Sequence, residues 1–129
     1  MKSINVAADF IIETMVNPTT EKTANRLYVY AANVNRNFNK EQLKYFKEVL
    51  ETGMEDEIYE YGTSELKTDY LPLGLLYDSL LVTDMPLNAC PLNMDVVVSK
   101  SDVKVRIGMN KPFEEIYQEK ENVKRKKLV

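Results

Sequence analysis

The spacing of apolar residues changes along this chain of 129 residues, and the change requires both helices and strands. Near the N-terminus, apolar side chains recur every three or four residues, which places them on one face of a helix. They are Ile4, Ala7, Ala8, Ile11, Ile12, Met15 and Val16. Between residues 103 and 107, apolar β-branched residues alternate with lysine and arginine, a pattern typical of a strand with one face in solvent. The two spacings predict an α+β fold.

The first 53 residues are expected to form a lobe of three helices. The predicted helices cover 4–16, 19 or 20 to 34, and 40–52. Ser3 and Asn39 are suited to N-cap the first and third helices, because a short polar side chain can accept a hydrogen bond from a free backbone N–H. Gly53 is the expected C-terminal stop of the third helix.

The middle segment, 54–93, is less regular. Residues 55–61 fit either a helical turn or a short edge strand, and the leucine-rich stretch 72–82 is expected to be a buried helix. Pro86 and Pro91 preclude regular helix after it and favour an extended, exposed path for 83–93.

The last segment, 94–129, is expected to hold one β-hairpin and a C-terminal helix. Residues 94–99 and 102–109 are the predicted strands, with a two-residue turn at 100–101, and consecutive valines suggest that the first strand is the more covered. Asn110 and Pro112 suit a helix start, and the basic run 124–127 suits a helix end. Together these segments predict a single, mainly helical α+β domain with an N-terminal three-helix lobe, one hairpin at about 94–109 and a C-terminal helix.

Composition excludes several chemistries and suggests a compartment. Without histidine, the chain cannot form a Ser-His-Asp triad or a His-bearing metal site. A single cysteine forbids an internal disulfide, which favours a reducing compartment. Asp9 and Glu13 interrupt the first apolar stretch, so we expect neither a signal peptide nor a membrane-spanning helix. A cytoplasmic protein is therefore predicted.

The net charge of −3 is unevenly distributed. Residues 1–47 carry +3, residues 48–99 carry −10 and residues 100–129 carry +4. One interpretation is that the acidic middle folds against the two basic ends. The other is that it binds a basic partner, since carboxylates steer association and interleaved tyrosines supply rigid contact area. The second predicts a non-enzymatic interaction module, an inhibitor or adaptor, whose partner-binding residues are Glu55, Asp56, Glu57, Tyr59, Glu60, Tyr61, Glu65, Asp69 and Tyr70.

A nucleic-acid-binding protein is the first alternative. Lysines share one face of the predicted third helix, and a basic run closes the chain, so both can contact phosphates. The residues are Lys40, Lys44, Lys47, Lys124, Arg125, Lys126 and Lys127. A solvated helix face and a helix dipole explain the same residues, and the acidic overall charge argues against nucleic acid.

A carboxylate-based metal-dependent enzyme is the second alternative. Asp9 and Glu13 stand one helical turn apart, as do Asp56 and Glu60, and such pairs can bind Mg²⁺ or exchange protons. Solvated surface pairs explain them equally. Cys90 lacks a nearby cation, which fits a small buried side chain better than a nucleophile. No glycine-rich phosphate loop or zinc spacing is present, and we expect neither a cofactor nor a catalytic residue.

A few N-terminal residues are similar to the Panacea domain, a helical module of antitoxin and phage-related proteins. They are Asn5-Val6-Ala7, Leu27-Tyr28 and Tyr30-Ala31. The family's Lys-Leu-Gln-Lys-Leu motif is absent, because residues 22–27 read KTANRL, and the second half of the chain has no counterpart. The resemblance implies a helical N-terminal region and carries no function to this chain.

Overall fold

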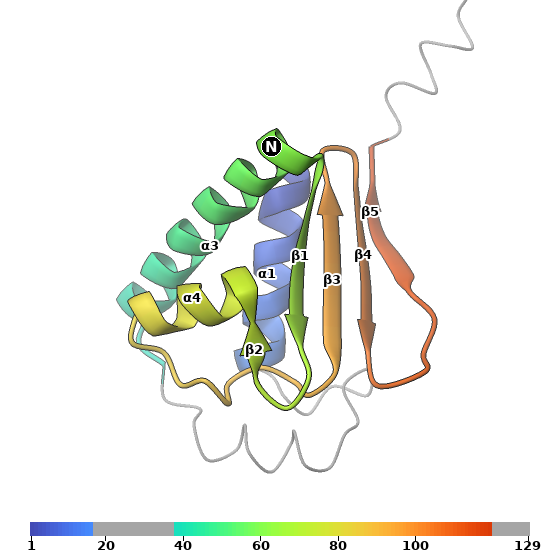
Figure 1. Ribbon diagram of the computed structural model, residues 1–129. Helices are drawn as coiled ribbons and strands as arrows, with labels where there is room; N and C mark the ends of the chain where they lie inside the picture. The colour runs from blue at the N-terminus through green and yellow to red at the C-terminus, as the bar shows by residue number, and fades with distance from the viewer. Residues whose placement is uncertain (17–37, 120–129) are drawn as a thin grey trace, which may run out of the picture.

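An antiparallel sheet forms the centre of the molecule in the computed structural model, which describes residues 1–16 and 38–119. Five strands appear in these residues: β1 Thr63–Thr68, β2 Pro72–Leu73, β3 Met94–Ser99, β4 Asp102–Ile107 and β5 Glu114–Gln118. Their order is β2-β1-β3-β4-β5, so β3 lies in the middle of the sheet (Figure 1).

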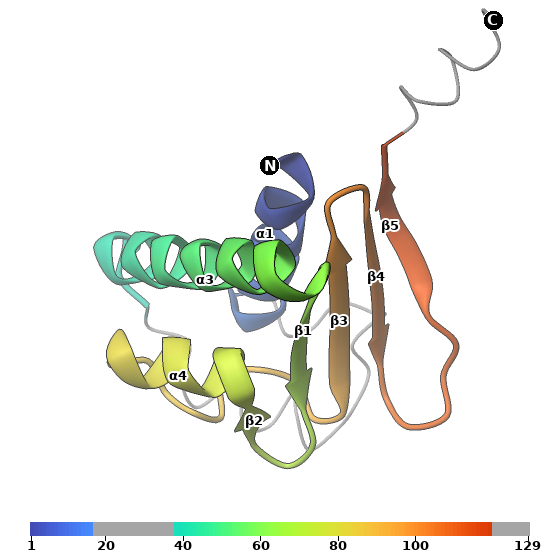
Figure 2. The same ribbon diagram turned by 45° about the horizontal axis from the view of Figure 1, so that its top comes forward.

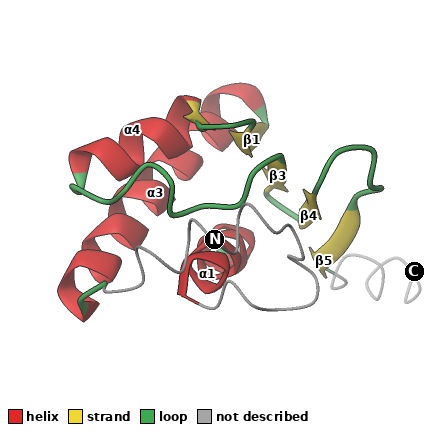
Figure 3. Cartoon of the chain, turned by 90° about the horizontal axis from the view of Figure 1, so that it is seen from below, coloured by secondary structure: helices red, strands yellow, loops and turns green. Residues whose placement is uncertain are grey.

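The helices described are α1 Lys2–Val16, α3 Lys40–Tyr61 and α4 Gly74–Val82. Helix α1 packs against β3, β4 and β5, whereas α3 contacts β1 and β3, and α4 contacts β1 and β2. Figure 2 shows α3 and α4 beside each other at the β1 side of the sheet. The loop between β4 and β5 lies on the side of the strands away from α1 (Figure 3). No helix in residues 1–16 and 38–119 is long and apolar enough to cross a membrane.

The helices and the sheet share one hydrophobic core. From α1 it takes the predicted residues Ile4, Ala7, Ala8, Ile11 and Met15, which confirms the N-terminal helix. From β3 it takes Met94, Val96 and Val98. Ser3 does not cap α1, because it lies within the helix and its hydroxyl donates to the Lys100 carbonyl at 3.3 Å. The predicted helix 19–34 falls outside the described residues.

The chain is α+β, but the expectation of a mainly helical fold with one hairpin is wrong. Strand β1 was missed because only one of its inward-facing residues, Leu66, is apolar. Ser64 and Thr68 also point inward, and each makes side-chain hydrogen bonds that replace contact with water. Thr68 Oγ1 donates to the Pro91 carbonyl at 2.6 Å and accepts from the Met94 N–H at 2.9 Å, which ties β1 to the start of β3.

Helix α3 is longer than predicted. Asn39 is its N-cap as expected, accepting a hydrogen bond from the Gln42 N–H at 2.7 Å. Gly53 does not stop it, because the helix continues to Tyr61. A Cβ at position 53 would clash with Leu75 Cδ1. Glycine at this position lets α4 approach α3 closely. The helix ends at Gly62, whose φ of +86° suits glycine, so residues 55–61 are helical.

The leucine-rich stretch contains a shorter helix than the sequence indicated. Residues 72–73 pair with β1 as strand β2, and α4 begins at Gly74, with Leu76 and Leu80 buried. The following loop, 83–93, is irregular as predicted, but the expectation that it is exposed is wrong. Met85, Ala89, Cys90 and Pro91 in it are buried.

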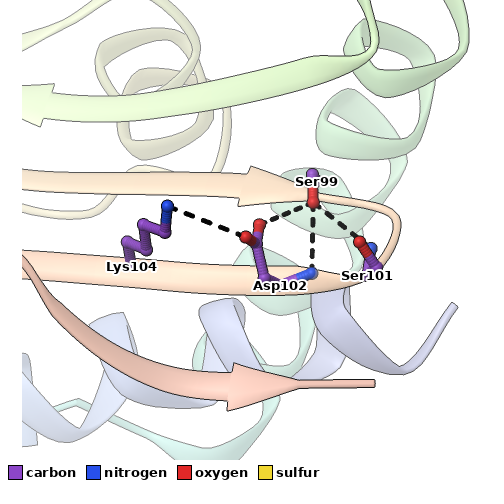
Figure 4. Close-up of polar contacts among 4 residues, drawn as sticks. All are labelled: Ser99, Ser101, Asp102 and Lys104. Atoms are coloured by element: carbon purple, nitrogen blue, oxygen red, sulfur yellow. Dashed lines mark hydrogen bonds and ion pairs between the residues drawn. The ribbon is translucent and has the colours of Figure 1, made fainter. Parts of the chain in front are cut away.

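The predicted hairpin is confirmed. Strands β3 and β4 are antiparallel, with Val98 opposite Val103, and β3 is the more covered strand. Side chains hold its turn, as Figure 4 shows. Ser99 Oγ donates to Asp102 Oδ1 at 2.6 Å and accepts from the backbone N–H groups of Ser101 and Asp102. These bonds stand in for the Asn-Gly chemistry that the turn lacks.

The predicted C-terminal helix is wrong for the residues described. Residues 114–118 form β5, which pairs with β4 so that Tyr117 lies opposite Val103. Asn110 has a φ of +62° and does not begin a helix. The β-forming residues Ile116 and Tyr117 pack against the core, and this contact outweighs the helix-start pattern. The basic run 124–127 lies outside the described residues.

Candidate functional site

The acidic, tyrosine-rich surface expected from the sequence is divided into two parts. Residues 55–61 form the last two turns of α3, and Glu65 lies on β1. Asp69 and Tyr70 lie in the turn between β1 and β2, at the other end of β1 (Figure 1). Six strand residues span roughly 20 Å, so the expected residues form two separate groups. We refer to Glu55, Asp56, Tyr59, Glu60 and Tyr61 as the acidic end of α3.

The side chains of the acidic end of α3 are presented to solvent. Tyr59 is 94% exposed and Tyr61 is 72% exposed, values that are unusual for large aromatic rings. Glu57 differs, because its Oε1 accepts a hydrogen bond of 2.6 Å from Ser64 Oγ. Glu57 therefore anchors the helix end to β1, whereas the five residues of the acidic end are available for contact.

The charges near the C-terminus of α3 oppose its dipole. A helix carries partial positive charge at its N-terminus and partial negative charge at its C-terminus, so carboxylates are unfavourable in the last turns. Nevertheless Asp56 and Glu60 lie there, and the last turn has no basic residue. The ion pairs among the described residues join Lys47 to Asp9, Lys104 to Asp102 and Arg106 to Asp95. None of them neutralises the acidic end of α3.

A cavity of about 350 Å³ adjoins the acidic end of α3. The N-terminus of α1, the C-terminal half of α3 and the turn between β3 and β4 surround it. Its lining residues are Met1, Glu55, Asp56, Ile58, Tyr59 and Lys100. The surface thus combines carboxylates with an apolar hollow, a mixture that suits a lysine or arginine side chain with its aliphatic stem.

The lysines of the nucleic-acid alternative lie at the opposite end of α3. Lys40 and Lys44 are exposed, but Lys47 Nζ forms an ion pair with Asp9 Oδ1 at 2.8 Å. That hydrogen-bonded pair raises the pKa of Lys47. The hairpin of β3 and β4 lies inside the sheet, where β1 and β5 flank it, so it does not project as the wing of a nucleic-acid-binding domain would. Lys124, Arg125, Lys126 and Lys127 lie outside the described residues.

The carboxylate pairs do not assemble a metal site in the part of the chain that the structure describes. Asp9 pairs with Lys47, and Asp56 and Glu60 remain on the exposed side of α3. No group of three or more carboxylates or thiols capable of holding a metal ion occurs within these residues. Cys90 is a buried free cysteine, and burial raises the pKa of its thiol to about 12. This thiol is not activated as a nucleophile.

Sequence reasoning missed a buried carboxylate on the face of the sheet opposite the helices. Asp95 is only 4% exposed, and its direct neighbours across the sheet are Lys67 on β1 and Arg106 on β4. Arg106 Nη2 donates to Asp95 Oδ2 at 3.4 Å, and its guanidinium lies 4.5 Å from the centroid of the Phe113 ring. Asp95 Oδ1 has no hydrogen-bond partner in the described residues.

The pKa of Asp95 is raised to about 6. Its burial is the largest cause, and the neighbouring Glu65 carboxylate adds to it, whereas Lys67 and Arg106 act in the opposite direction. The only sequence signal is an acidic residue preceding three valines in a strand. That pattern does not reveal burial, because the covering residues come from other strands.

Comparisons with known proteins do not place the chain in a family. A scan against protein-family models found no match, and a search of curated proteins found no similar sequence.

Proposed function

We propose that this protein is a non-enzymatic interaction module, an inhibitor or adaptor, that binds a basic partner protein through the acidic end of α3. One observation carries the proposal. Exposed carboxylates and tyrosines are held at the negative end of a long helix, and none of the ion pairs within residues 1–16 and 38–119 involves them. Lys100 lines the adjoining cavity but forms no ion pair with Glu55 or Asp56. A fold selected only for stability would place lysine or arginine there.

The two kinds of side chain would contribute differently to binding. Glu55, Asp56 and Glu60 would attract a positive surface and orient it before contact, which mainly affects the association rate. Tyr59 and Tyr61 would provide contact area once water is excluded, and tyrosine is frequent among residues that dominate binding energy. The adjacent cavity would accept a lysine or arginine side chain of the partner.

The partner class follows from the charge. A protein whose own ligand is nucleic acid presents a positive groove, and an array of carboxylates can occupy it in place of phosphates. We propose a cytoplasmic setting for this interaction, because a lone reduced cysteine and the lack of any disulfide pair fit a reducing compartment. The proposed surface does not include Glu65, Asp69 or Tyr70. Glu57 supports it indirectly, because its hydrogen bond to Ser64 attaches the end of α3 to β1.

The test is a charge-reversed variant with a matched control. The variant E55K/D56K/E60K alters the proposed surface, whereas E41K/D78K/E115K changes net charge equally at exposed residues elsewhere. Immobilised wild-type protein would capture the partner from the source cells, and the affinity of the purified partner for each variant would then be measured. We expect the surface variant to bind at least about tenfold more weakly, with wild-type binding falling as salt increases.

Thermal stability provides the internal control. Lysines at the end of α3 complement the helix dipole, so the surface variant should lose binding while its Tm stays equal or rises. The proposal fails if the surface variant binds as tightly as wild type, or if the matched control loses as much affinity.

Nucleic-acid binding remains a second candidate on the strength of Lys40 and Lys44, which are exposed at the other end of α3. It predicts retention on a phosphate-bearing column with a steep salt dependence, lost in K40E/K44E and kept in E55K/D56K/E60K. Nothing in the described residues favours a metal-dependent enzyme.

A further inference from the structure

A second cavity, of about 300 Å³, lies at the other end of β1 from the acidic end of α3. Three segments that are distant in the sequence form it: the end of β1, the start of β3, and the end of β4 with the loop that follows. Its polar lining residues include Lys67, Asp69, Asp95 and Arg106. The proposed function does not use this cavity.

The backbone around this cavity is held in conformations that side chains rarely adopt. Asn93, Gly108 and Asn110 all line it, and their φ angles are +53°, +110° and +62°. The Gly108 N–H donates to the Asn93 carbonyl at 3.0 Å, and the Asn93 N–H donates to the Asp69 carbonyl at 3.0 Å. These bonds fix the three segments to one another. Such clusters of unfavourable backbone are retained most often at ligand sites.

The buried carboxylate of Asp95 supplies an independent indication of a ligand. Its side chain is more than nine-tenths buried, yet Oδ1 accepts no hydrogen bond from the described residues. A buried carboxylate oxygen without a donor is unfavourable, and native structures usually satisfy such an atom. Above the pKa of about 6 that burial gives this group, the carboxylate is ionised and requires a donor even more strongly.

Cations on both sides of Asp95 restrict which donor can bind. Lys67 and Arg106 lie directly opposite Asp95 on the neighbouring strands, about 10 Å apart at their Cα atoms. The two cations favour a carboxylate, whereas Asp95, with Glu65 beside it and Asp69 in the lining, favours an ammonium group. A molecule that carries a protonated amine beside a carboxylate matches both signs of charge.

We propose that this cavity binds a small zwitterion of the α-amino acid class, whose ammonium group donates to Asp95 and whose carboxylate contacts Arg106 and Lys67. The guanidinium of Arg106 has five donor hydrogens and makes one long contact to Asp95, so it retains donors for a carboxylate. Its stacking on Phe113 holds it in place for that role. The cavity is large enough for a free amino acid.

The experiment is a titration of the full chain with individual L-amino acids at neutral pH, followed in amide proton–nitrogen correlation spectra. We expect at least one of them to shift the signals of Asn93, Asp95 and Gly108 in a saturable way. For that amino acid, two derivatives are then compared: the N,N,N-trimethyl form, which has no N–H donor, and the carboxylic acid without the amine. Both should bind at least about tenfold more weakly.

Variants assign the binding to the proposed groups. Asp95→Asn should weaken binding of the same amino acid at least about tenfold, whereas the exposed control Asp78→Asn should leave it unchanged. If Asp95→Asn does not fold, Arg106→Gln and the two derivatives still decide the question. The proposal is overturned if no amino acid produces saturable shifts, leaving only water at Asp95, or if the amine-free acid binds equally well.

Discussion

Asp95 illustrates how little of a buried polar site can be read at the level of single residues. In the sequence it is one of eleven acidic residues between positions 48 and 99, next to three valines. Its surroundings depend on Lys67 and Arg106, which strand pairing brings to either side. No local pattern encodes those contacts.

We expect the contribution of Asp95 to the stability of the protein to decrease as pH rises from about 4 to about 6. The unfolded chain has an ordinary aspartate pKa of about 3.9, whereas folding raises that of Asp95 to about 6. The folded state therefore binds more protons in this window, and the stabilisation by protonated Asp95 is lost as pH rises through it. The loss is on the order of 3 kcal/mol.

Urea unfolding of wild type and Asp95→Asn across this pH range measures the effect. The variant cannot titrate at residue 95, so the difference between the two unfolding free energies isolates this residue from other carboxylates. That difference should change steadily between the two pKa values and level off above the higher one. A difference independent of pH would contradict the assignment.

At the scale of helices and strands, the elements with strong apolar periodicity were predicted correctly. Helix α1 and the hairpin of β3 and β4 are examples, because the buried face of each consists of Ile, Val, Ala or Met residues. Strand β1 was missed because polar Ser64 and Thr68 face inward. Strand β5 was assigned to a helix because its pairing with β4 has no local signal. Where the local pattern was weak, pairing between distant segments thus determined the secondary structure.

Gly53 provides a test of the packing between α3 and α4. Replacing it with alanine favours the helix by up to about 1 kcal/mol, but the new Cβ would meet Leu75. Three atoms of that side chain lie within 3.2 Å, so its whole branched end must move. We expect Gly53→Ala to lower the free energy of unfolding in the wild-type background and to raise it in the Leu75→Ala background.

A double-mutant cycle by chemical denaturation measures this coupling. A sign change between the two backgrounds places the cost at the contact with Leu75. Additive effects would mean that α4 moves away without cost and that Gly53 is no more than a weak helix residue.

Across the whole molecule, the sequence predicted that charges are segregated along the chain, but it did not predict where the acidic residues lie in the folded structure. The nine residues of the expected surface belong to one continuous acidic segment, yet β1 separates them into two groups. Helix α3 continues past Gly53, its expected stop. It therefore carries basic residues near its N-terminus and acidic residues near its C-terminus. The candidate surface therefore depends on one long helix, α3. The sequence predicted that this helix would end at Gly53, which would have separated its basic and acidic residues into two elements.

Cys90 should report unfolding of the entire domain. It lies in the core, and the pKa of its thiol is about 12, so the reactive thiolate is absent near neutral pH. We expect a thiol reagent to modify the native protein only as fast as the chain unfolds, and the denatured protein at once. The reaction is followed by mass spectrometry with increasing urea. Rapid modification without urea would show that loop 83–93 opens independently of the core.

Helix α1 packs against β3, β4 and β5 as well as against α3. On a ribosome, the apolar side of α1 that faces the sheet is thus synthesised long before the strands that cover it, since more than seventy residues separate Val16 from Met94. Helix α3 is made earlier and covers another part of α1. Until β3, β4 and β5 pair, the nascent chain exposes apolar side chains of α1, which are a substrate for holding chaperones.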